Sequence, residues 1–410
     1  MSGLLEGVRV LDAGILLGAT TGMYLADMGA DVVKVESPPR GDYVRDFLGQ
    51  ITPHHSPTYM QCNKNKRSLT LNLRAPAGRE LFFELLRSSD VYIDGFVAGR
   101  AESLGIGYED QKKVKPDIIY CQVTGYGAQG PYSQVPTHGY LMSALAGALS
   151  VEIAGDGSVR PAENTDIFEG TASGGDASSA EAAYAAMHIA AALVQRARTG
   201  EGCKLDASGA DSVIAAGHIG AVTTLNFERL IDPDDFEGAP SADSEIAAKY
   251  AHYRTSDNRI VMLAATEHKF WDTFCRAIGR EDLARLKNES APSDWGFYEG
   301  LKPELQKVFA QRSLEEWMSL AITEGIPIGP TNRVRELQDD PQLEAREILL
   351  TSEHPNAGPF TYVGTPVMVQ DQPYSIRLHS PEMGEHTDAI LKELGHSQSE
   401  IEKWRSDGVV

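Results

Sequence analysis

An aspartate stands alone between two glycines and an alanine-rich run in the stretch GGDASSAEAAYAAMHIAAAL, residues 174–193. One interpretation is structural: Asp176 is a helix N-cap whose carboxylate accepts hydrogen bonds from the first backbone N–H groups of the helix. The other is chemical, because a carboxylate at a helix N-terminus stays ionised and can attack an acyl group as a nucleophile. Both interpretations fit these residues, so the rest of the chain has to distinguish them.

The elements that would position Asp176 belong to an alternating pattern. A helix is predicted from Asp176 to Arg198, and Cys203–Gly217 is predicted to hold a strand and the start of a helix. Nearer the N-terminus, Gly7–Gly14 and Ala30–Pro39 are apolar runs that predict buried strands around a helix over Ala19–Gly29. Strand, helix and strand in about 30 residues form a parallel βαβ unit.

The alternation continues to about residue 130. Further strands are predicted at Ser68–Leu73, Val91–Phe96 and Asp117–Gly127, with an amphipathic helix over Ala77–Asp90. This pattern predicts an α/β fold with a doubly wound, Rossmann-like parallel sheet. The glycines of the first turn are spaced GxxxGxxxG rather than GxGxxG, so we predict that they allow close packing of helix on strand and do not bind a dinucleotide.

The composition and the pattern of predicted elements change after about residue 222. Residues 226–244 are polar and acidic, which is typical of a linker or loop. Two antiparallel strands are then predicted at Tyr250–Arg254 and Arg259–Ala265, followed by helices at Lys269–Ile278 and Leu301–Thr323. These elements predict a second, smaller α+β domain. After residue 330 the predicted elements are a helix over 333–339, strands around 360–365 and a helix over 387–394.

Composition excludes several classes of function. The 410 residues include 58 acidic and 37 basic side chains, a formal net charge of −21, which argues against a general binder of nucleic acid or anionic membranes. We find no secretory signal and no apolar stretch of the roughly 18 residues that span a bilayer. The four cysteines are far apart and lack metal-ligand spacing. We therefore expect a cytoplasmic protein with reduced thiols and no metal.

Several stretches together resemble one family, the class III coenzyme A transferases (CaiB/BaiF-like), whose relatives include formyl-CoA transferases and α-methylacyl-CoA racemases. The resemblance extends along almost the whole chain, and its motifs occur in family order. They are GVRVLDAG…LADMGADVVKVESPPRGD, CNKNKRSLTLNL, SLGIGYE, VTGYGAQGPY, RTGEGCKLDASGADS, YAHYRTSDN, GIPIGP and GEHTDAILKELG.

The resemblance implies a fold and an assembly. A large Rossmann-like, CoA-binding domain would comprise residues 1–222 and 330–410, with a small α+β domain inserted over 223–329. Two chains would interlock as a homodimer. The activity implied is transfer of coenzyme A from an acyl-CoA donor to a carboxylic acid acceptor, through an aspartyl anhydride and an aspartyl-CoA thioester. Acyl-CoA and the acid would be substrates, and no metal or nicotinamide cofactor is expected.

The resemblance also implies which aspartate reacts. The pair Gly175-Asp176 matches the family's catalytic motif of glycine, aspartate and a helix of small residues. Strict counting back from Gly200 would put the acid at Ser178, but a serine cannot form an acyl anhydride, so Asp176 is preferred and Asp166 is the alternative.

Two rival functions remain open. The racemase branch uses a histidine and an aspartate as acid and base on opposite faces of the α-carbon, and VPTHGYLMSALAG places His138 where that branch has its histidine. Glu267 also resembles an acid near the racemase site. The second rival is a non-catalytic, acyl-CoA-binding paralogue. Leu17 replaces a glutamine of the formyl-CoA transferases and their glycine-rich loop is missing, which predicts a less polar site than oxalate would need.

The CoA phosphates require basic groups, and strand ends are where α/β proteins bind ligands. The predicted CoA-binding set contains such basic residues and four others. The others are two residues of the DGFVAGR segment, a neighbouring apolar residue and a tyrosine expected beside the thioester. This set is Lys34, Arg40, Lys66, Arg67, Gly95, Phe96, Leu104 and Tyr126, with Lys64 as a further candidate. His386, in GEHTD, is expected to be structural.

Overall fold

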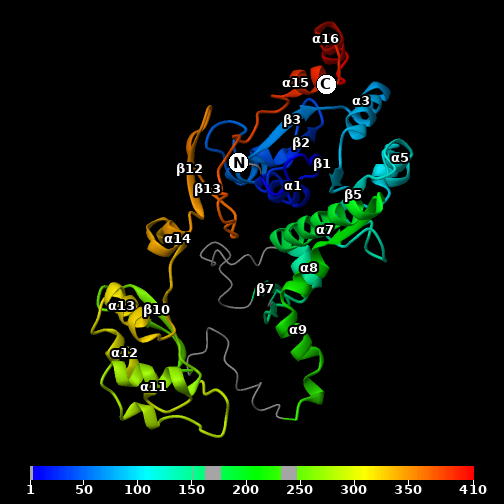
Figure 1. Cartoon of the computed structure of the whole chain (residues 1–410). Coiled ribbons are helices and arrows are strands. Elements are labelled where there is room, and N and C mark those ends of the chain that lie inside the picture. The colour runs from blue at the N-terminus through cyan, green and yellow to red at the C-terminus, as the bar shows by residue number, and fades with distance from the viewer. Residues whose placement is uncertain (1–2, 150, 162–176, 232–246) are drawn as a thin grey trace. The chain divides into compact units, whose positions relative to one another are not determined.

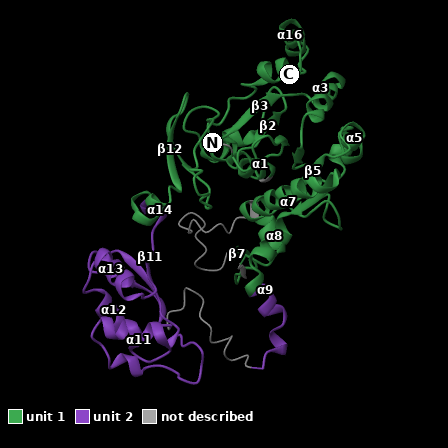
Figure 2. Cartoon of the chain, in the orientation of Figure 1, with its two compact units in different colours: residues 1–219, 338–410 green, residues 220–337 purple. Residues whose placement is uncertain are grey.

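The computed structural model describes residues 3–149, 151–161, 177–231 and 247–410. The chain forms two compact units: residues 1–219 together with 338–410, and residues 220–337 (Figure 2). The second unit therefore interrupts the first in the sequence. Its bounds lie a few residues from those expected from the change in composition.

The first unit contains a six-stranded sheet in the order β3-β2-β1-β4-β5-β8, and every adjacent pair of its strands is parallel. In sequence order the strands are β1 (Arg9–Ala13), β2 (Asp31–Glu36), β3 (Lys66–Thr70), β4 (Val91–Asp94), β5 (Ile119–Thr124) and β8 (Cys203–Ser208). The predicted doubly wound α/β sheet is confirmed. Strand order reverses between β1 and β4, the point at which such sheets bind ligands outside their carboxyl ends.

Helices cover both faces of this sheet because successive strand residues point to opposite sides. Leu11 of β1 packs in a core with α3 (Pro76–Arg87), α15 (Thr387–Glu393) and α16 (Gln398–Ser406). Its neighbour Val10 packs in a second core. That core includes α1 (Leu17–Asp27) and α7 (Ala177–Thr199), which lie against each other (Figure 1). The helix α16 was not anticipated from the sequence.

Glycine allows α1 to approach β1 closely. A Cβ on Gly14 would lie 2.4 Å from Cα of Gly18, and a Cβ on Gly22 would lie 2.4 Å from Oδ2 of Asp12. Both distances are shorter than any real Cβ contact, so larger residues would push the helix off the strand. The packing role predicted for these glycines is confirmed for Gly14 and Gly22, whereas a Cβ on Gly18 would lie 3.6 Å from its nearest atom, an ordinary contact.

The C-terminal segment is an integral part of the first unit. The backbone N–H of His386 donates to the carbonyl of Ser68 on β3, and the N–H of Ser68 lies 3.3 Å from Nδ1 of His386. Further along, Asn72 N–H donates to the carbonyl of Val409. His386 therefore joins the tail to the edge strand of the sheet, as expected of a structural residue.

The other elements of the first unit are short. They are α2 (Pro57–Asn63), α4 (Arg100–Ser103), α5 (Tyr108–Val114), α6 (Tyr140–Leu145), β6 (Val151–Ile153), β7 (Val159–Pro161), α8 (Gly209–Ala216), α14 (Pro341–Ala345), β12 (Leu349–His354) and β13 (Gly358–Val363). Helix α9 (His218–Leu225) crosses the boundary between the two units.

The second unit has its own sheet and core. An antiparallel sheet in the order β11-β10-β9 comprises Ile328–Pro330, Ile260–Ala264 and Tyr250–Arg254. Helix α11 (His268–Ala277) packs against it around the aromatic rings of Phe274, Phe309 and Trp317. The antiparallel pair and the α+β character agree with the sequence interpretation.

One helix prediction in the second unit was wrong. The segment expected as a single helix forms α12 (Leu301–Phe309) and α13 (Leu314–Glu324). Ser313 starts the second helix because its hydroxyl accepts from Glu316 N–H while the Glu316 carboxylate accepts from Ser313 N–H, a capping box. In addition, residues 334–339 form a 3-10 helix rather than an α-helix. In the part of the chain that is described, no helix has the length and apolar character to cross a membrane.

Candidate active site

Two adjoining cavities open at the carboxyl edge of the parallel sheet, and Ile15, just after β1, lines both. The first has a volume of about 170 Å³ and the second of about 230 Å³. The residues that line the first are Ala13, Ile15, Lys34, Val35, Glu36, Ser37, Gly41, Asp42, Leu71, Leu73, Arg74, Phe96, Arg100 and Leu104. The first cavity therefore lies at the ends of β1, β2, β3 and β4, where strand order reverses.

The second cavity continues from the ends of β4 and β5 into the following loop and α6. Its lining is Ile15, Leu16, Tyr43, Gly95, Val97, Val123, Thr124, Gly125, Tyr126, Gly127, Ser133, Val135, Pro136, Thr137, His138, Gly139 and Met142. Seven of the thirteen side chains in this list are apolar, and among the described residues the lining contains no lysine, arginine or carboxylate. Such a surface suits an uncharged acyl chain more than an acyl chain that carries a second charged group.

Six of the predicted residues line these cavities. Lys34, Phe96 and Leu104 line the first, and Gly95, Tyr126 and His138 line the second. The Tyr126 hydroxyl donates to the carbonyl of Leu141 at 3.0 Å, which fixes the ring against α6. The His138 side chain is exposed, one residue before the N-cap of that helix. The structure thus brings together the two groups expected near an acyl-CoA.

Two of the predicted lysines hold the fold together instead of offering charge to a ligand. Nζ of Lys66 is completely buried, 2.8 Å from Oδ2 of Asp12 and 2.7 Å from the carbonyl of Ala19. Burial lowers the pKa of Lys66 and outweighs the effect of Asp12. A phosphate cannot reach this ammonium group, so the sequence-based assignment of Lys66 is corrected. Lys64 is likewise buried and pairs with Asp27 at 2.9 Å.

Lys34 borders the first cavity, but its charge is neutralised. Its Nζ lies 2.7 Å from Oδ2 of Asp42 and 2.6 Å from the carbonyl of Gly14. Burial lowers the pKa of Lys34, while the carboxylates of Asp42, Asp12 and Glu36 raise it by more. The ion pair fixes the loop after β2 against the end of β1, so Lys34 shapes the cavity and does not supply a net positive charge.

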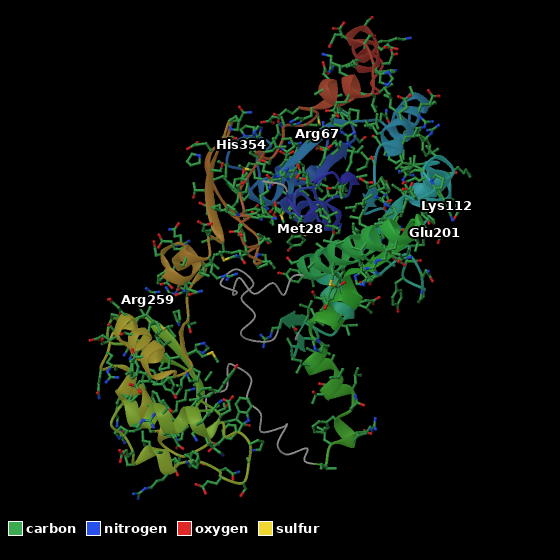
Figure 3. The ribbon with its side chains drawn as sticks, in the orientation of Figure 1. Met28, Arg67, Lys112, Glu201, Arg259 and His354 are labelled. Carbon is green, nitrogen blue, oxygen red and sulfur yellow. The ribbon has the colours of Figure 1, made fainter. Side chains whose placement is uncertain are left out.

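Arg67 stands on β3, the edge strand of the sheet (Figure 3). Its guanidinium pairs with Asp31 at 2.7 Å and with Glu393 of α15 at 2.7 Å. Although burial raises the pKa of Asp31, hydrogen bonds and charges from Arg67 and Arg9 hold it below its usual range. Arg67 lines neither cavity and links sheet to tail, so its phosphate contact stays a prediction.

Exposed arginines surround the first cavity. Arg74 and Arg100 line it, and Arg40 immediately precedes the lining residue Gly41. Arg40 was predicted from the sequence, whereas Arg74 and Arg100 were missed. A signal for both was present, because Arg74 directly follows the strand SLTLNL and Arg100 ends the segment DGFVAGR.

Asp94 fixes the turn that separates the two cavities. Its Oδ1 accepts from the N–H of Phe96 at 3.1 Å, and its Oδ2 accepts from the hydroxyl of Tyr120 at 2.6 Å. Burial raises the pKa of Asp94 to about 6, even though both hydrogen bonds favour its ionised form. Asp94 therefore positions Gly95 and Phe96 from behind the cavity walls.

The two aspartates predicted as nucleophiles, Asp176 and Asp166, lie outside the described residues, so their roles remain predictions. The helix expected from Asp176 is observed as α7, beginning at Ala177. Over the described ranges, no group of three or more histidine, cysteine, aspartate or glutamate side chains could hold a metal ion.

Comparison with known proteins identifies the family of this chain. The family model of CoA-transferase family III matches residues 5–387. A succinyl-CoA:glutarate CoA-transferase of Homo sapiens is 32% identical over 99% of this chain and 90% of its own. A formyl-CoA:oxalate CoA-transferase of Streptomyces coelicolor is 30% identical over 99% of both chains.

A solved structure has the same fold. The crystal structure of a CaiB/BaiF family protein from Brucella suis superposes with a TM-score of 0.73 at 26% identity, covering 96% of this chain and all of that one. The family match extends over nearly the whole chain, through the sheet, both cavities and the second unit. The chain belongs to CoA-transferase family III.

Proposed function

We propose that this protein transfers coenzyme A from an acyl-CoA donor to a carboxylic acid acceptor. The observation that carries the proposal is the pair of adjoining cavities at the carboxyl edge of the sheet, one bordered by arginines and the other mostly apolar. An acyl-CoA has the same two parts, a phosphorylated nucleotide and an acyl chain. Family membership supplies the reaction class.

The nucleotide end binds in the first cavity. Exposed guanidinium groups of Arg40, Arg74 and Arg100 can hold phosphate oxygens with paired N–H donors, a geometry that lysine lacks. Phe96 and Leu104 supply apolar surface in the same cavity. The chain then passes Gly95, which lines the second cavity, so the thioester would lie close to Tyr126 and His138.

The reaction requires a nucleophile near that thioester, and Asp176 is the proposed one. Its carboxylate attacks the carbonyl carbon of the donor thioester and the C–S bond breaks. CoA departs as the thiolate, and the acyl group stays joined to Asp176 as a mixed anhydride. The thiolate then attacks the aspartyl carbonyl and releases the donor as a carboxylate. An acceptor carboxylate then attacks the aspartyl-CoA thioester, which gives a second mixed anhydride and releases the CoA thiolate. The thiolate attacks the acceptor's carbonyl in this anhydride, which forms the new thioester and frees Asp176. Backbone N–H groups of the Gly125–Gly127 turn would stabilise the oxyanions.

A peptide-mapped mass spectrum after brief incubation with a panel of acyl-CoAs tests this route, with hydroxylamine to trap acylated carboxyl groups. The expected result is a modification on Asp176 that Asp176→Asn abolishes and Asp166→Asn leaves unchanged. A modification on Asp166 would reassign the nucleophile. If the panel binds but neither transfer nor any adduct occurs, the protein is an acyl-CoA-binding paralogue and the proposal fails.

A second candidate function is favoured by the position of His138 in the second cavity. An imidazole at this position can act as a general base toward the carbon next to a thioester. The same incubations in D₂O distinguish this racemase-type reaction. Transfer of CoA without deuterium at the α-carbon supports the transferase, whereas deuterium incorporation that His138→Ala removes supports proton transfer.

A further inference from the structure

A buried carboxyl group lies directly behind the wall of the second cavity. Glu181, in the first turns of α7, has no exposed surface. A Cβ placed on Gly209, at the start of α8, would lie 3.0 Å from Oε2 of Glu181 and 2.3 Å from Sδ of Met142. The side chains of Glu181 and Met142 therefore both lie next to Gly209. Met142 lines the second cavity, so Glu181 lies behind this part of the cavity wall.

The polar atoms at this position lack hydrogen-bond partners. Among the described residues, neither carboxyl oxygen of Glu181 has one, and the hydroxyl of Thr124 has none either. Thr124 ends β5 and also lines the second cavity. Buried polar atoms in proteins are nearly always hydrogen-bonded, so such a group requires an explanation. An ionised carboxylate here would be especially costly, because burying a charge without a partner loses its hydration.

The charges that face Glu181 increase this cost. The described groups that act on its carboxyl are Asp206 on β8 and Asp211 on α8, both acidic, and the neighbouring thiol of Cys121 on β5 is uncharged. Burial and, less strongly, the charges of Asp206 and Asp211 together raise the pKa of Glu181 to about 9, although the nearby backbone N–H of Thr124 favours the ionised form. The carboxyl is thus uncharged at neutral pH.

We propose that Glu181 retains its proton at neutral pH and keeps its part of the wall of the acyl cavity uncharged, so that Asp206 behind Gly127 is not joined by a second negative charge and an anionic carboxylate acceptor can bind there. This inference rests on the proposed function, because that function requires such an anion in the second cavity. Ionised Glu181 would repel the acceptor through the cavity wall, where like charges interact strongly. Glu181 is a positioning residue in this scheme, since it does not touch the reacting atoms.

The first test is the pH dependence of transfer. In the wild type, KM for the acceptor acid should rise above pH 9 by roughly tenfold per pH unit as Glu181 ionises, while kcat changes less. Glu181→Gln keeps the shape and removes the ionisation, so its acceptor KM should stay flat. The matched control is Glu201→Gln, beyond the far end of the same helix (Figure 3), which should behave like the wild type. An equal rise in Glu181→Gln would overturn the proposal.

The second test does not depend on activity. Infrared difference spectra of the full chain should show the C=O band of a protonated carboxyl at pH 7 that fades through pH 9 and is absent from Glu181→Gln. Absence of this band in the wild type at pH 7 would overturn the inference directly. If the band is present but no acyl-CoA supports transfer, the proposed function fails, and the acceptor-binding role of Glu181 fails with it.

Discussion

At the scale of single residues, burial separates arginines that can bind a ligand from cations that hold the fold. Lys66 and Arg67 follow Lys64 in one basic segment, yet both are paired with carboxylates. Lys66 pairs with Asp12, and Arg67 pairs with Asp31 and Glu393. Arg74 and Arg100 remain exposed at the first cavity. The sequence shows the basic residues, whereas only the fold shows which of them have carboxylate partners.

This difference predicts opposite effects of arginine substitutions. Arg74→Ala and Arg100→Ala should each raise KM for an acyl-CoA roughly tenfold, because a charge-assisted hydrogen bond to phosphate contributes about 1.5–3 kcal/mol. Neither change should lower the free energy of unfolding by more than about 0.5 kcal/mol, as expected of surface positions. Arg67→Ala should do the reverse, with lower stability and an unchanged KM. Steady-state kinetics and urea unfolding of the three variants check this prediction, and a raised KM in Arg67→Ala alone would contradict it.

A second residue-scale prediction concerns the buried pair of Asp12 and Lys66. Gly22→Ala places a methyl group 2.4 Å from Oδ2 of Asp12 and 3.2 Å from Nζ of Lys66, so the pair must separate or α1 must shift. Disrupting a buried ion pair costs about 3–5 kcal/mol, which exceeds the about 1 kcal/mol that alanine gains over glycine in a helix. We expect a net loss of about 2–4 kcal/mol in urea unfolding.

The matched control for this substitution lies one turn earlier in the same helix. A Cβ on Gly18 would meet its nearest atom, Cγ2 of Ile93, at 3.6 Å, an ordinary contact. Gly18→Ala should therefore leave stability unchanged or raise it slightly. If both variants lose stability equally, the loss has a cause other than the ion pair.

At the scale of elements, the sequence predicts those strands and helices whose positions depend on hydrophobic periodicity and apolar runs. The strands of the parallel sheet and helix α7 form where the pattern placed them, because apolar runs between glycines have few alternatives in a buried sheet. Boundaries set by single side chains were missed. The capping boxes at Ser313 and Ser397 start α13 and α16, and both are readable in the sequence as serine followed three residues later by glutamate.

Tertiary features of the site were not readable in this way. Glu181 is the single acidic residue in an alanine-rich helix, so the sequence predicts that its side chain is exposed to solvent. Its burial depends on α8 and α6, which reach it only after the chain has folded. The same holds for Lys66, whose partner Asp12 lies 54 positions away. Long-range pairing of this kind leaves no local signal in one sequence.

The elements around the second cavity predict its substrate preference. Seven of the thirteen side chains that line this cavity are apolar, and none of the described ones is a lysine, arginine or carboxylate. Short apolar acyl-CoAs should therefore react with higher kcat/KM than formyl-CoA, and oxalate should be a poor acceptor. Met142→Ala should shift the preference toward longer chains, because it removes a buried side chain from the wall. A panel of acyl-CoAs assayed by CoA exchange measures this, and a clear preference for oxalate would show that the lining does not set specificity.

At the scale of the whole molecule, the two units have separate cores. Ile401 is fully buried among α3, α15 and β-strands of the first unit, and Leu305 is fully buried in the core of the second. Loss of such a side chain to alanine costs about 2–5 kcal/mol. Since no buried cluster of the described residues contains side chains from both units, we expect each substitution to destabilise only its own unit.

The tryptophans make this measurable in the full chain. Trp271, Trp295 and Trp317 lie in the second unit and Trp404 in the first, so in a Trp404→Phe background fluorescence reports the second unit alone. Leu305→Ala should move that fluorescence transition to lower urea, while Ile401→Ala should leave it in place and move only the transition seen by circular dichroism. If Ile401→Ala shifts both signals equally, the units unfold as one, and the energy of each core is shared across the boundary near residue 220. Separate transitions would mean that the sheet and its two cavities derive their stability from the N-terminal half and the C-terminal tail, with the inserted unit folding on its own core.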